Sequence, residues 1–470
     1  MGELNSVDDA FEARLRAALP DDVIRPLTPA YLEEPRGLFH GRGGLLVAPS
    51  TTEEVATTIR ACATARVPVV PYGGGTGLVG GQVMPDARAV ILSLERLTRI
   101  RAVHPSENVL VAEAGVVLAD VQAAAATADR LFPLSLASEG SCRIGGCLST
   151  NAGGVNVLRY GTARDLCLGV EAVLPDGSVH HGLKRLRKDN TGFDLRGLLC
   201  GAEGTLGVIT AASLRMYPRP AQTGTAMVSV RDPQAALDLL AMAQAQLGQG
   251  ISAFELIKGT GLKFLSATGF GHNLPFQAIP NWSVLIELGL GPSQDPEAEL
   301  AALFDTARSA GVAQDGIIAQ SIRQRDALWK LREDIPWANK AIGSISSHDI
   351  SLPLSAIPTF LQDADKALAA FGPVRVNAFG HLGDGNLHYN VFPPEGQTAD
   401  DFEPLRQRVR DIVYGLVHQA DGSLSAEHGV GRLKPHELRR YGDPARLSAM
   451  RRIKDALDPQ GIMNPGVIFE

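Results

Sequence analysis

The stretch PYGGGTGLVGG at residues 71–81 decides how the first half of the chain is interpreted. It follows the strand-like run VPVV and places four glycines and one threonine in the five residues 73–77. Successive backbone N–H groups without Cβ crowding can form an anion nest for a diphosphate. A tight turn needs fewer glycines, so we favour ligand binding. The spacing does not match a Rossmann strand–GxGxxG–helix turn, because no helical pattern follows it.

Two further glycine clusters follow in the same half of the chain. The run SEGSCRIGGCLSTNAGGVNVLRYG, residues 138–161, mixes small polar residues with glycines. This suits a flat ring system lying against backbone with hydroxyl and amide groups at its rim, and a purely structural loop is the alternative. The third run, CGAEGTLGVIT at 200–210, places a small-residue turn before a strand. Around these clusters strand and helix patterns alternate, up to a proline-rich break near residue 220.

The second half of the chain has a different pattern. Residues 221–375 alternate strand-like runs, such as WSVLIELGL, with helices expected at 232–247, 296–311 and 353–371. This alternation predicts an antiparallel α+β domain. Two more helical patterns follow, and the chain ends in an extended run, GIMNPGVIFE.

Bulk composition excludes several classes of protein. A net charge of −7 argues against nucleic acid as a partner. Five cysteines without a CxxC motif suit a reducing compartment. The first residues lack the apolar core of a signal peptide, and no run of 18 apolar residues is present. We therefore expect a cytoplasmic protein, with peripheral contact to a membrane left open.

The run GHLGDGNLHYN at residues 380–390 carries two histidines seven residues apart. Its glycines make a helix unfavourable, and on one strand an odd spacing sends His381 and His388 to opposite faces. If the two imidazoles converge, a glycine turn must carry the first back to the second. His388 and Asn390 alternate with Leu387 and Tyr389, which predicts a strand after the turn.

A third metal-ligand candidate lies in the run SAEHGVG at 425–431. Glu427 offers a carboxylate, and His428 is adjacent; on an extended segment the two side chains would point different ways. His381, His388 and Glu427 together suit Zn²⁺ or a similar divalent ion, because the set is too rich in nitrogen for Ca²⁺ or Mg²⁺. A half-buried hydrogen-bonding role is the usual alternative for a single histidine.

Three glycine loops in this order resemble the flavin-binding domain of the vanillyl-alcohol-oxidase, or PCMH, type, and the C-terminal motifs resemble the FAD-linked oxidase C-terminal domain. The most similar group is the FAD-dependent D-2-hydroxyacid dehydrogenases, which include D-2-hydroxyglutarate and D-lactate dehydrogenases and the glycolate oxidase flavoprotein subunit. The resemblance implies an α+β fold. Its parts would be a PCMH-type FAD-binding domain of two α/β subdomains at 1–220, an antiparallel-sheet substrate or cap domain at 221–425, and a C-terminal helical segment at 426–470 that closes on the FAD domain.

The resemblance assigns flavin-binding roles to residues of all three loops and of the C-terminal run. The diphosphate would be held by Gly73, Gly74, Gly75, Thr76 and Gly77. The ribityl chain and isoalloxazine would be lined by Ser141, Gly145, Thr150, Asn151 and Gly154. Glu203, Gly204 and Ile209 would contact the adenosine side or the ring, and Asn464 would return to the flavin. Covalent members of the superfamily carry a histidine where Gly75 stands here, so the sequence predicts non-covalent FAD.

The motifs GHxGDGNxH and EHG of the family are intact and place His381, His388 and Glu427 as metal ligands. Asn390 and His428 fall on substrate positions, and His428 is the expected general base. Arg332 stands where relatives that bind a dicarboxylate use an arginine; a solvated arginine on a helix surface is the alternative. The relatives that bind a dicarboxylate also carry a Lys where Ser347 stands, and some carry a Thr where Pro336 stands. The sequence therefore predicts a D-2-hydroxy acid without naming which one.

The expected reaction is oxidation of a D-2-hydroxy acid, of the D-2-hydroxyglutarate or D-lactate class, to the 2-oxo acid with hydride transfer to flavin. Two alternatives stay open: a glycolate-oxidase-type flavoprotein subunit that works in a complex, and an O₂-using flavin alcohol oxidase of the same fold. The expected partners are the small-molecule 2-hydroxy acid and an electron acceptor, which would be an electron-transfer flavoprotein, a quinone or a cytochrome. A homodimer is a possible assembly.

Overall fold

A computed structural model describes residues 4–270 and 274–470 and divides the chain into two compact units. The first unit comprises Met1–Gly153, Gly161–Arg219 and Glu427–Glu470, and the second comprises Gly154–Tyr160 and Pro220–Ala426. The sequence placed the boundaries after residues 220 and 425. The segment Gly154–Tyr160 departs from the predicted division, because it belongs to the second unit.

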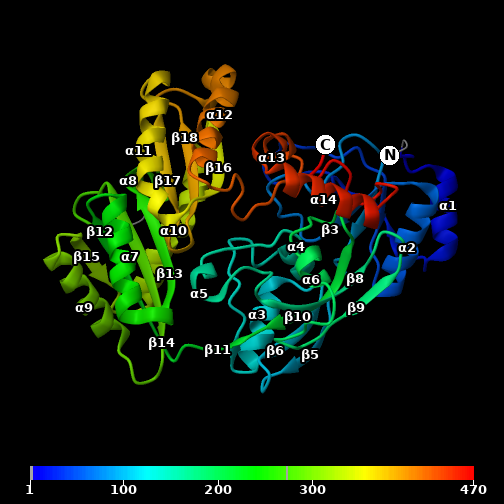
Figure 1. Ribbon diagram of the computed structural model, residues 1–470, viewed down its shortest axis with the longest axis horizontal. Helices are drawn as coiled ribbons and strands as arrows, with labels where there is room; N and C mark the ends of the chain where they lie inside the picture. The colour runs from blue at the N-terminus through cyan, green and yellow to red at the C-terminus, as the bar shows by residue number, and fades with distance from the viewer. Residues whose placement is uncertain (1–3, 271–273) are drawn as a thin grey trace. The chain divides into compact units, whose positions relative to one another are not determined.

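The first unit contains two main sheets with helices packed on them (Figure 1). Its helices are α1 (Asp9–Ala18), α2 (Thr52–Ala65), α3 (Leu118–Thr127), α4 (Ile144–Ser149), α6 (Leu195–Leu199), α13 (Pro435–Tyr441) and α14 (Pro444–Leu457). Its strands are β1 (Ile24–Arg25), β2 (Leu45–Val47), β3 (Val69–Tyr72), β4 (Val90–Ser93), β5 (Ile100–His104), β6 (Val109–Glu113), β7 (Arg130–Leu131), β8 (Cys167–Val173), β9 (Val179–Gly182), β10 (Val208–Arg215) and β11 (Tyr217–Pro218).

The smaller sheet has the order β1-β2-β4-β3 and carries the first glycine cluster at the end of β3. Strands β2 and β3 both run parallel to β4. Helix α2 begins after Thr51, whose hydroxyl accepts the N–H of Glu54, as expected for a helix N-cap. The C-terminal run lies along β3, because the N–H of Val69 bonds to Ile462 and the N–H of Asn464 bonds to Val69. The apolar side chains of these elements form one core.

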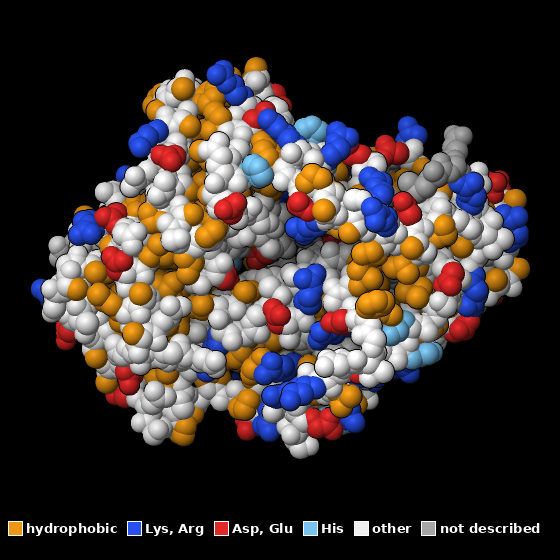
Figure 2. Space-filling view, viewed as in Figure 1, with side chains coloured by type: hydrophobic (Ala, Val, Ile, Leu, Met, Phe, Trp, Pro, Cys, Tyr) orange, Lys and Arg blue, Asp and Glu red, His pale blue; other side chains and the backbone are white. Residues whose placement is uncertain are grey.

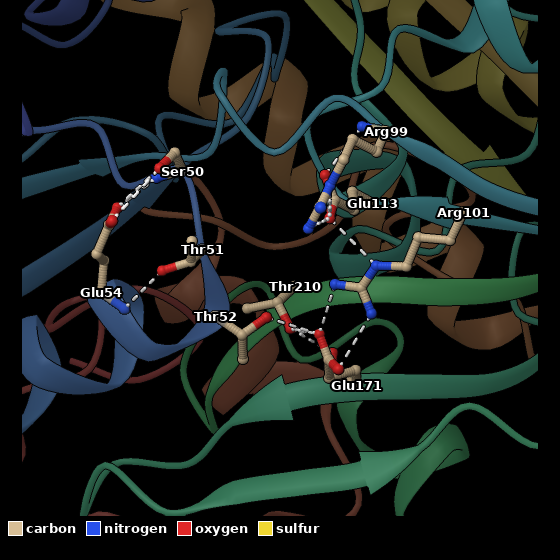
Figure 3. Close-up of polar contacts among 9 residues, drawn as sticks. All are labelled: Ser50, Thr51, Thr52, Glu54, Arg99, Arg101, Glu113, Glu171 and Thr210. Atoms are coloured by element: carbon tan, nitrogen blue, oxygen red, sulfur yellow. Dashed lines mark hydrogen bonds and ion pairs between the residues drawn. The ribbon is translucent and has the colours of Figure 1, made fainter.

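The larger sheet is antiparallel, with the order β5-β6-β10-β8-β9. The run CLGVEAVLPDGSVHHG at 167–182 predicts a hairpin with a Pro-Asp-Gly turn at 175–177. The structure confirms it as β8 and β9, paired from Val170 opposite Gly182 to Val173 opposite Val179. Two buried carboxylates are paired on this sheet: Arg101 contacts both Glu113 and Glu171, while Thr52 and Thr210 donate their hydroxyls to Glu171 (Figure 3). Each carboxylate is thus paired, as burial of charge requires.

The second unit is built on one seven-stranded sheet of order β15-β12-β14-β13-β17-β18-β16 (Figure 1). Its strands are β12 (Gln222–Val230), β13 (Ile251–Lys258), β14 (Trp282–Leu290), β15 (Ala313–Ile318), β16 (Ser346–Ser351), β17 (Arg375–His381) and β18 (Asn386–Phe392). Its helices are α5 (Val157–Tyr160), α7 (Pro233–Leu247), α8 (Gly259–Ala267), α9 (Pro296–Ser309), α10 (Ile322–Ile342), α11 (Ile357–Leu368) and α12 (Glu403–Gln419). All of the pairings are antiparallel, as expected from the sequence.

The two faces of this sheet carry different helices. Alternate side chains of each strand point to opposite faces, and Met227, Ile257, Leu285 and Phe379 pack with the apolar residues of α8 and α10. Helices α7, α9, α11 and α12 contact the strands from the other face, where Tyr389 meets Phe360 of α11. The face under α8 and α10 is apolar toward β12 and polar toward β16, and this polar end carries the histidines predicted to bind metal.

The segment Gly154–Tyr160 joins the second unit through α5, which contacts β13. The guanidinium of Arg159 donates to the hydroxyl of Ser252 at 3.0 Å and to the carbonyl of Gly289 at 2.6 Å. A Cβ placed on Gly383 would lie 2.6 Å from Leu158, so α5 also packs closely on the turn between β17 and β18. These contacts explain why a segment within the second glycine cluster lies with the later domain.

Charged side chains on the face shown in Figure 2 are mixed in sign, with Lys and Arg interspersed among Asp and Glu. All five cysteines are buried free thiols. Within residues 4–270 and 274–470, none of the helices is both long and apolar enough to cross a membrane.

Candidate functional site

A hairpin brings the two predicted metal-binding histidines together. Strand β17 ends at His381, a single 3₁₀ turn spans Leu382–Asp384, and β18 begins at Asn386. Gly385 closes the turn with a φ of 83°, a conformation that glycine adopts without a Cβ penalty. The predicted glycine turn is therefore confirmed, and the rings of His381 and His388 lie 5.6 Å apart between centroids.

Each histidine has a carboxylate on its Nδ1 side. Nδ1 of His381 lies 2.6 Å from Oε1 of Glu255, which is fully buried on β13. Nδ1 of His388 lies 3.8 Å from Oδ1 of Asp349 on the adjacent strand β16. The first contact is a short hydrogen bond, and the second is an ion-pair distance only. Burial alone would raise the pKa of Glu255, but its contacts with His381 and Arg332 outweigh burial and hold this pKa below its usual value.

Arg332 is buried rather than solvated. It lies on α10 with 5% of its surface exposed, and its Nε donates to Oε2 of Glu255 at 2.7 Å. Its guanidinium carbon lies 4.8 Å from the centre of the Phe379 ring. The solvated-surface interpretation is therefore wrong, because a buried arginine needs the paired carboxylate and aromatic face that it has here.

The chain leaves the second unit at Ala426, whose N–H bonds to the carbonyl of Asp349 at 3.2 Å. Glu427 is the next residue, and one ligand atom each from His381, His388 and Glu427 lie within 4.8 Å of one another. Asp349, Glu427 and His428 form a second such group.

Nε2 of His428 lies 3.7 Å from Oε1 of Glu427. The expectation that these neighbouring side chains point different ways is wrong, because the backbone bends here instead of extending.

The donor set fits a divalent metal of the zinc type. Two imidazole nitrogens and one carboxylate oxygen are its ordinary ligands, and ligands on one zinc lie roughly 3.4 Å apart for bonds of about 2.1 Å. Atoms within 4.8 Å of one another need only a small contraction to reach that spacing. Three protein ligands also leave a position for another molecule, which is the arrangement of a catalytic rather than a structural site.

Asn390 lies two residues after His388 on β18, so both side chains are on the same face of the sheet. It is 8% exposed and stands opposite Asn377 on one side and Ser347 on the other. Asn377 and Asn339 of α10 share a hydrogen bond, yet Oδ1 of Asn377 and Nδ2 of Asn339 have no partner among the described residues. A buried polar surface therefore continues from the histidines along β18.

The first glycine cluster forms an open loop after β3, and no residue in the described part of the chain accepts a hydrogen bond from the backbone N–H groups of residues 74–78. The loop lies against the second cluster: a Cβ on Gly74 would lie 2.3 Å from the carbonyl oxygen of Ser141, and a Cβ on Gly73 would lie 3.3 Å from Cα of Gly146. The glycines thus allow two loops to touch through backbone. The unpaired N–H groups suit the diphosphate expected there.

The third cluster and the C-terminal run meet the first two loops within the same unit. The N–H of Glu203 bonds to the carbonyl of Ser149, and a Cβ on Gly204 would lie 2.9 Å from Pro71. Nδ2 of Asn464 donates to the carbonyls of Gly81 and Glu203 at 3.0 and 2.9 Å. Its buried Oδ1 has no partner among the described residues. Segments from four parts of the sequence therefore converge within the first unit. The Oδ1 of Asn464 is a buried acceptor that a bound group could use.

The carboxylate of Glu203 has a local role that the sequence did not reveal. It accepts the backbone N–H groups of Val430 and Gly431 at 2.8 and 2.7 Å. Burial raises the pKa of Glu203, although these two bonds act against that rise. Because Val430 follows His428 by two residues, Glu203 fixes the backbone that carries His428.

The other expected flavin residues differ in their placement. Gly145 lies in α4, so the second cluster contains a short helix rather than one continuous loop. The hydroxyl of Thr150 bonds to the carbonyl of Gly146, and Oδ1 of Asn151 accepts the N–H of Arg164. Ile209 is buried in β10 with 2% exposure, and Gly154 lies in the second unit.

Two features of the site were missed at the sequence level. Glu255 is the one charged residue in the apolar run ISAFELI at 251–257, and an ionisable residue in a buried strand is a usable signal of a paired or functional charge. Asp349 lies in the mostly polar run SISSHD, so it does not stand out from its neighbours as a charged residue in an apolar run does.

Comparison with known proteins gives a family match for each half of the chain. The FAD binding domain family matches residues 44–182, and the FAD linked oxidases, C-terminal domain family matches residues 219–468. The mitochondrial D-2-hydroxyglutarate dehydrogenase of Arabidopsis thaliana is 35% identical over 465 residues, covering 99% of this chain and 79% of that protein. Its Bos taurus counterpart is 38% identical over 459 residues, covering 96% and 82%. The chain belongs to the FAD-dependent D-2-hydroxyacid dehydrogenase family.

Members of this family are enzymes, and the chain is an FAD-dependent dehydrogenase that oxidises a 2-hydroxy acid. A solved structure of p-cresol methylhydroxylase with substrate bound has a TM-score of 0.77 and 16% identity, covering 98% of this chain and 97% of that one. This similarity confirms the predicted α+β fold of the PCMH type.

Proposed function

We propose that this family member oxidises a D-2-hydroxy acid to the 2-oxo acid, with non-covalent FAD and a divalent metal held by His381, His388 and Glu427. The observation that carries the proposal is the grouping of one ligand atom from each of these residues within 4.8 Å. Zn²⁺ suits two imidazoles and a carboxylate. When bound, the metal would polarise the substrate's 2-hydroxyl and carboxylate, and FAD would accept the hydride from C2.

His428 is the proposed general base. It follows the metal ligand Glu427 directly, and a ring nitrogen of His428 belongs to a group with Asp349 and Glu427 in which the ligand atoms lie within 4.8 Å. A neutral imidazole can accept the proton of the 2-hydroxyl as a general base. Glu203 supports this role by fixing the backbone at Val430 and Gly431. Asn390 offers an amide beside His388 for a substrate oxygen.

The FAD cradle is proposed from the converging loops of the first unit. Backbone N–H groups of Gly73 to Gly77 would bind the diphosphate, and Ser141, Gly145, Thr150, Asn151, Gly154, Glu203, Gly204, Ile209 and Asn464 are the further candidates. Gly75 has no nucleophile to offer, and its φ of 71° suits glycine. The flavin is therefore expected to leave the protein on denaturation.

Arg332 is the residue proposed to bind the distal carboxylate of a dicarboxylate substrate. Its Nε is used by Glu255, which leaves its two Nη groups for an acceptor with the planar geometry of a carboxylate. The relatives named as D-2-hydroxyglutarate dehydrogenases make that dicarboxylate the first compound to test. Ser347 supplies a hydroxyl instead of a cation and bonds to Ser344 at 2.8 Å. We therefore expect weaker discrimination between D-2-hydroxyglutarate and D-lactate than a site with two cations would give.

A dye-coupled assay on the purified holoprotein tests the proposal. D-2-Hydroxyglutarate, D-lactate, D-malate, glycolate and the L-enantiomers are compared before and after dialysis against a chelator, with and without added Zn²⁺. We expect oxidation of one or more D-2-hydroxy acids that is lost with the metal and restored by it. Full activity after metal removal would refute the metal, and inactivity toward every D-2-hydroxy acid would refute the substrate class. An electron-transfer flavoprotein, a quinone or a cytochrome is the expected natural acceptor.

A further inference from the structure

Glu255 joins two residues that have separate proposed roles. It lies on β13 with none of its surface exposed. Oε1 is 2.6 Å from Nδ1 of His381, and Oε2 is 2.7 Å from Nε of Arg332. Both contacts have the length of charge-assisted hydrogen bonds. Each oxygen of one carboxylate is therefore committed to a different functional side chain.

The contact with His381 determines which ring nitrogen carries the proton. An ionised carboxylate only accepts hydrogen bonds, so the proton of a neutral imidazole must lie on Nδ1. Nε2 is then left without a proton, which is the state required of a metal ligand. A carboxylate behind a ligating histidine fixes the tautomer and the ring orientation and makes the ligand more basic.

The contact with Arg332 fixes the other side chain. Arginine is long and flexible, and holding its Nε against a buried carboxylate removes most of its rotamer freedom. Phe379 packs against the guanidinium from β17, the strand that also carries His381. The two Nη groups keep their fork geometry, which matches a carboxylate.

We propose that Glu255 is a positioning residue that presents Nε2 of His381 to the metal and the guanidinium of Arg332 to the substrate carboxylate. This inference rests on the metal site of the proposed function and extends it. One buried side chain links metal affinity to substrate affinity, so a single substitution should weaken both. A purely structural ion pair would affect only the stability of the fold.

Glu255→Gln is the decisive variant. An amide that accepts from Arg332 presents its NH₂ group to Nδ1 of His381, which favours the tautomer with the proton on Nε2. We expect zinc affinity, measured by competition with a chromogenic chelator on FAD-loaded protein, to fall about 10- to 100-fold. KM for D-2-hydroxyglutarate should rise more than KM for D-lactate, because only the dicarboxylate would use Arg332.

Glu287→Gln is the matched control. Glu287 lies on the neighbouring strand β14, opposite Ala253, and accepts hydrogen bonds from Thr225 and Trp329. Its loss should lower the melting temperature and leave zinc affinity unchanged. Glu255→Asp keeps the charge but shortens the side chain, so its zinc affinity should lie between the wild type and the amide variant.

The outcomes separate this inference from the proposed function. The metal proposal fails if the wild-type protein binds no zinc. It also fails if the wild type binds zinc and His381→Ala binds it equally well. If wild-type protein binds zinc at that site and Glu255→Gln binds it equally well, only the role of Glu255 is overturned. Should Glu255→Gln fail to fold, the Asp variant decides, since wild-type zinc affinity in that variant contradicts the inference.

Discussion

His381 and His388 lie on neighbouring strands with their rings 5.6 Å apart and inclined at 81°. His388 stands opposite Phe379, not opposite His381, so the two imidazoles are diagonal neighbours on one face of the sheet. A diagonal offset lets both rings approach a common point without stacking. The turn at 382–385 sets this offset, which links the spacing of the motif to the approach of its two imidazoles.

Removing one of the proposed ligands should prevent binding of the proposed metal. His388→Ala deletes one of three protein donors, and we expect zinc per chain, measured by elemental analysis, to drop at least tenfold. Flavin content should stay at the wild-type level, because His388 lies in the second unit and the glycine loops lie in the first. The exposed His418→Ala on α12 is the control and should retain zinc. Unchanged zinc in the His388 variant would remove this residue from the ligand set.

His428→Ala should separate binding from turnover. Loss of a general base typically costs 10²- to 10⁴-fold in rate, so kcat should fall by that factor while FAD and zinc remain bound. Rapid-reaction measurement of flavin reduction isolates the chemical step. The exposed His436 on α13 gives a matched Ala variant, which should keep wild-type kcat. Near-normal flavin reduction in the His428 variant would assign the proton transfer to another group.

The parts of the fold predicted from sequence are those with a strong local signal. Glycines cluster where loops touch through backbone, as at Gly74, so their density marked the flavin-binding region. The turn residues Pro175, Asp176 and Gly177 marked the hairpin of β8 and β9. These features are encoded within a few neighbouring residues, and the sequence therefore reveals them.

Other features depend on residues far apart in the chain. Helix α10 was not among the expected helices, although a helix surface was the alternative considered for Arg332. Pro336 lies inside it and is unfavourable there, while Leu331 and Ile335 of the same helix pack into the core. Glu255 and His381 are 126 residues apart, and the pairing of β13 with β17 alone brings them together. The segment 154–160 joins the second unit through contacts with strands β13 and β14. The residues of the segment carry no local pattern that predicts these contacts.

Arg332→Lys should distinguish substrates with and without a distal carboxylate. Lysine keeps the charge but loses the fork that donates to Glu255 and to a carboxylate together. We expect KM for D-2-hydroxyglutarate to rise roughly tenfold or more, and KM for D-lactate to change little. The conservative control is Arg323→Lys on the exposed part of the same helix. Equal effects on both substrates would show that Arg332 does not read the distal group.

Gly74→Ala should disrupt the flavin cradle. The added Cβ would lie 2.3 Å from the carbonyl oxygen of Ser141, a contact that only a backbone shift can relieve. We expect FAD per chain, read from the absorbance of flavin released by denaturation, to fall severalfold. Gly140→Ala in the adjacent loop is the control, because its Cβ would meet nothing within 4 Å. Full flavin content in the Gly74 variant would contradict close packing of the two loops.

Glu171 should make the fold sensitive to acid. Burial raises the pKa of Glu171, but the hydrogen bonds from Arg101, Thr52 and Thr210 together lower it by more than burial raises it (Figure 3). The net shift of this pKa is therefore downward from 4.5. A carboxyl whose pKa is lower in the folded state stabilises the fold above its unfolded pKa and loses that contribution as pH falls through the folded value. Glu171→Gln should lower the free energy of unfolding at pH 7 by about 1–3 kcal/mol.

The pH dependence gives the sharper test of this pair. Denaturant unfolding of the wild type and of Glu171→Gln, measured from pH 7 to pH 3, should show a difference that is constant above about pH 5 and shrinks below it. The more exposed pair of Glu107 with Arg185, whose charged groups lie 3.2 Å apart, supplies the control Glu107→Gln. That variant should change stability by no more than about 1 kcal/mol. A Glu171 difference that stays constant down to pH 3 would show that the side chain stabilises the fold through packing, because packing does not titrate.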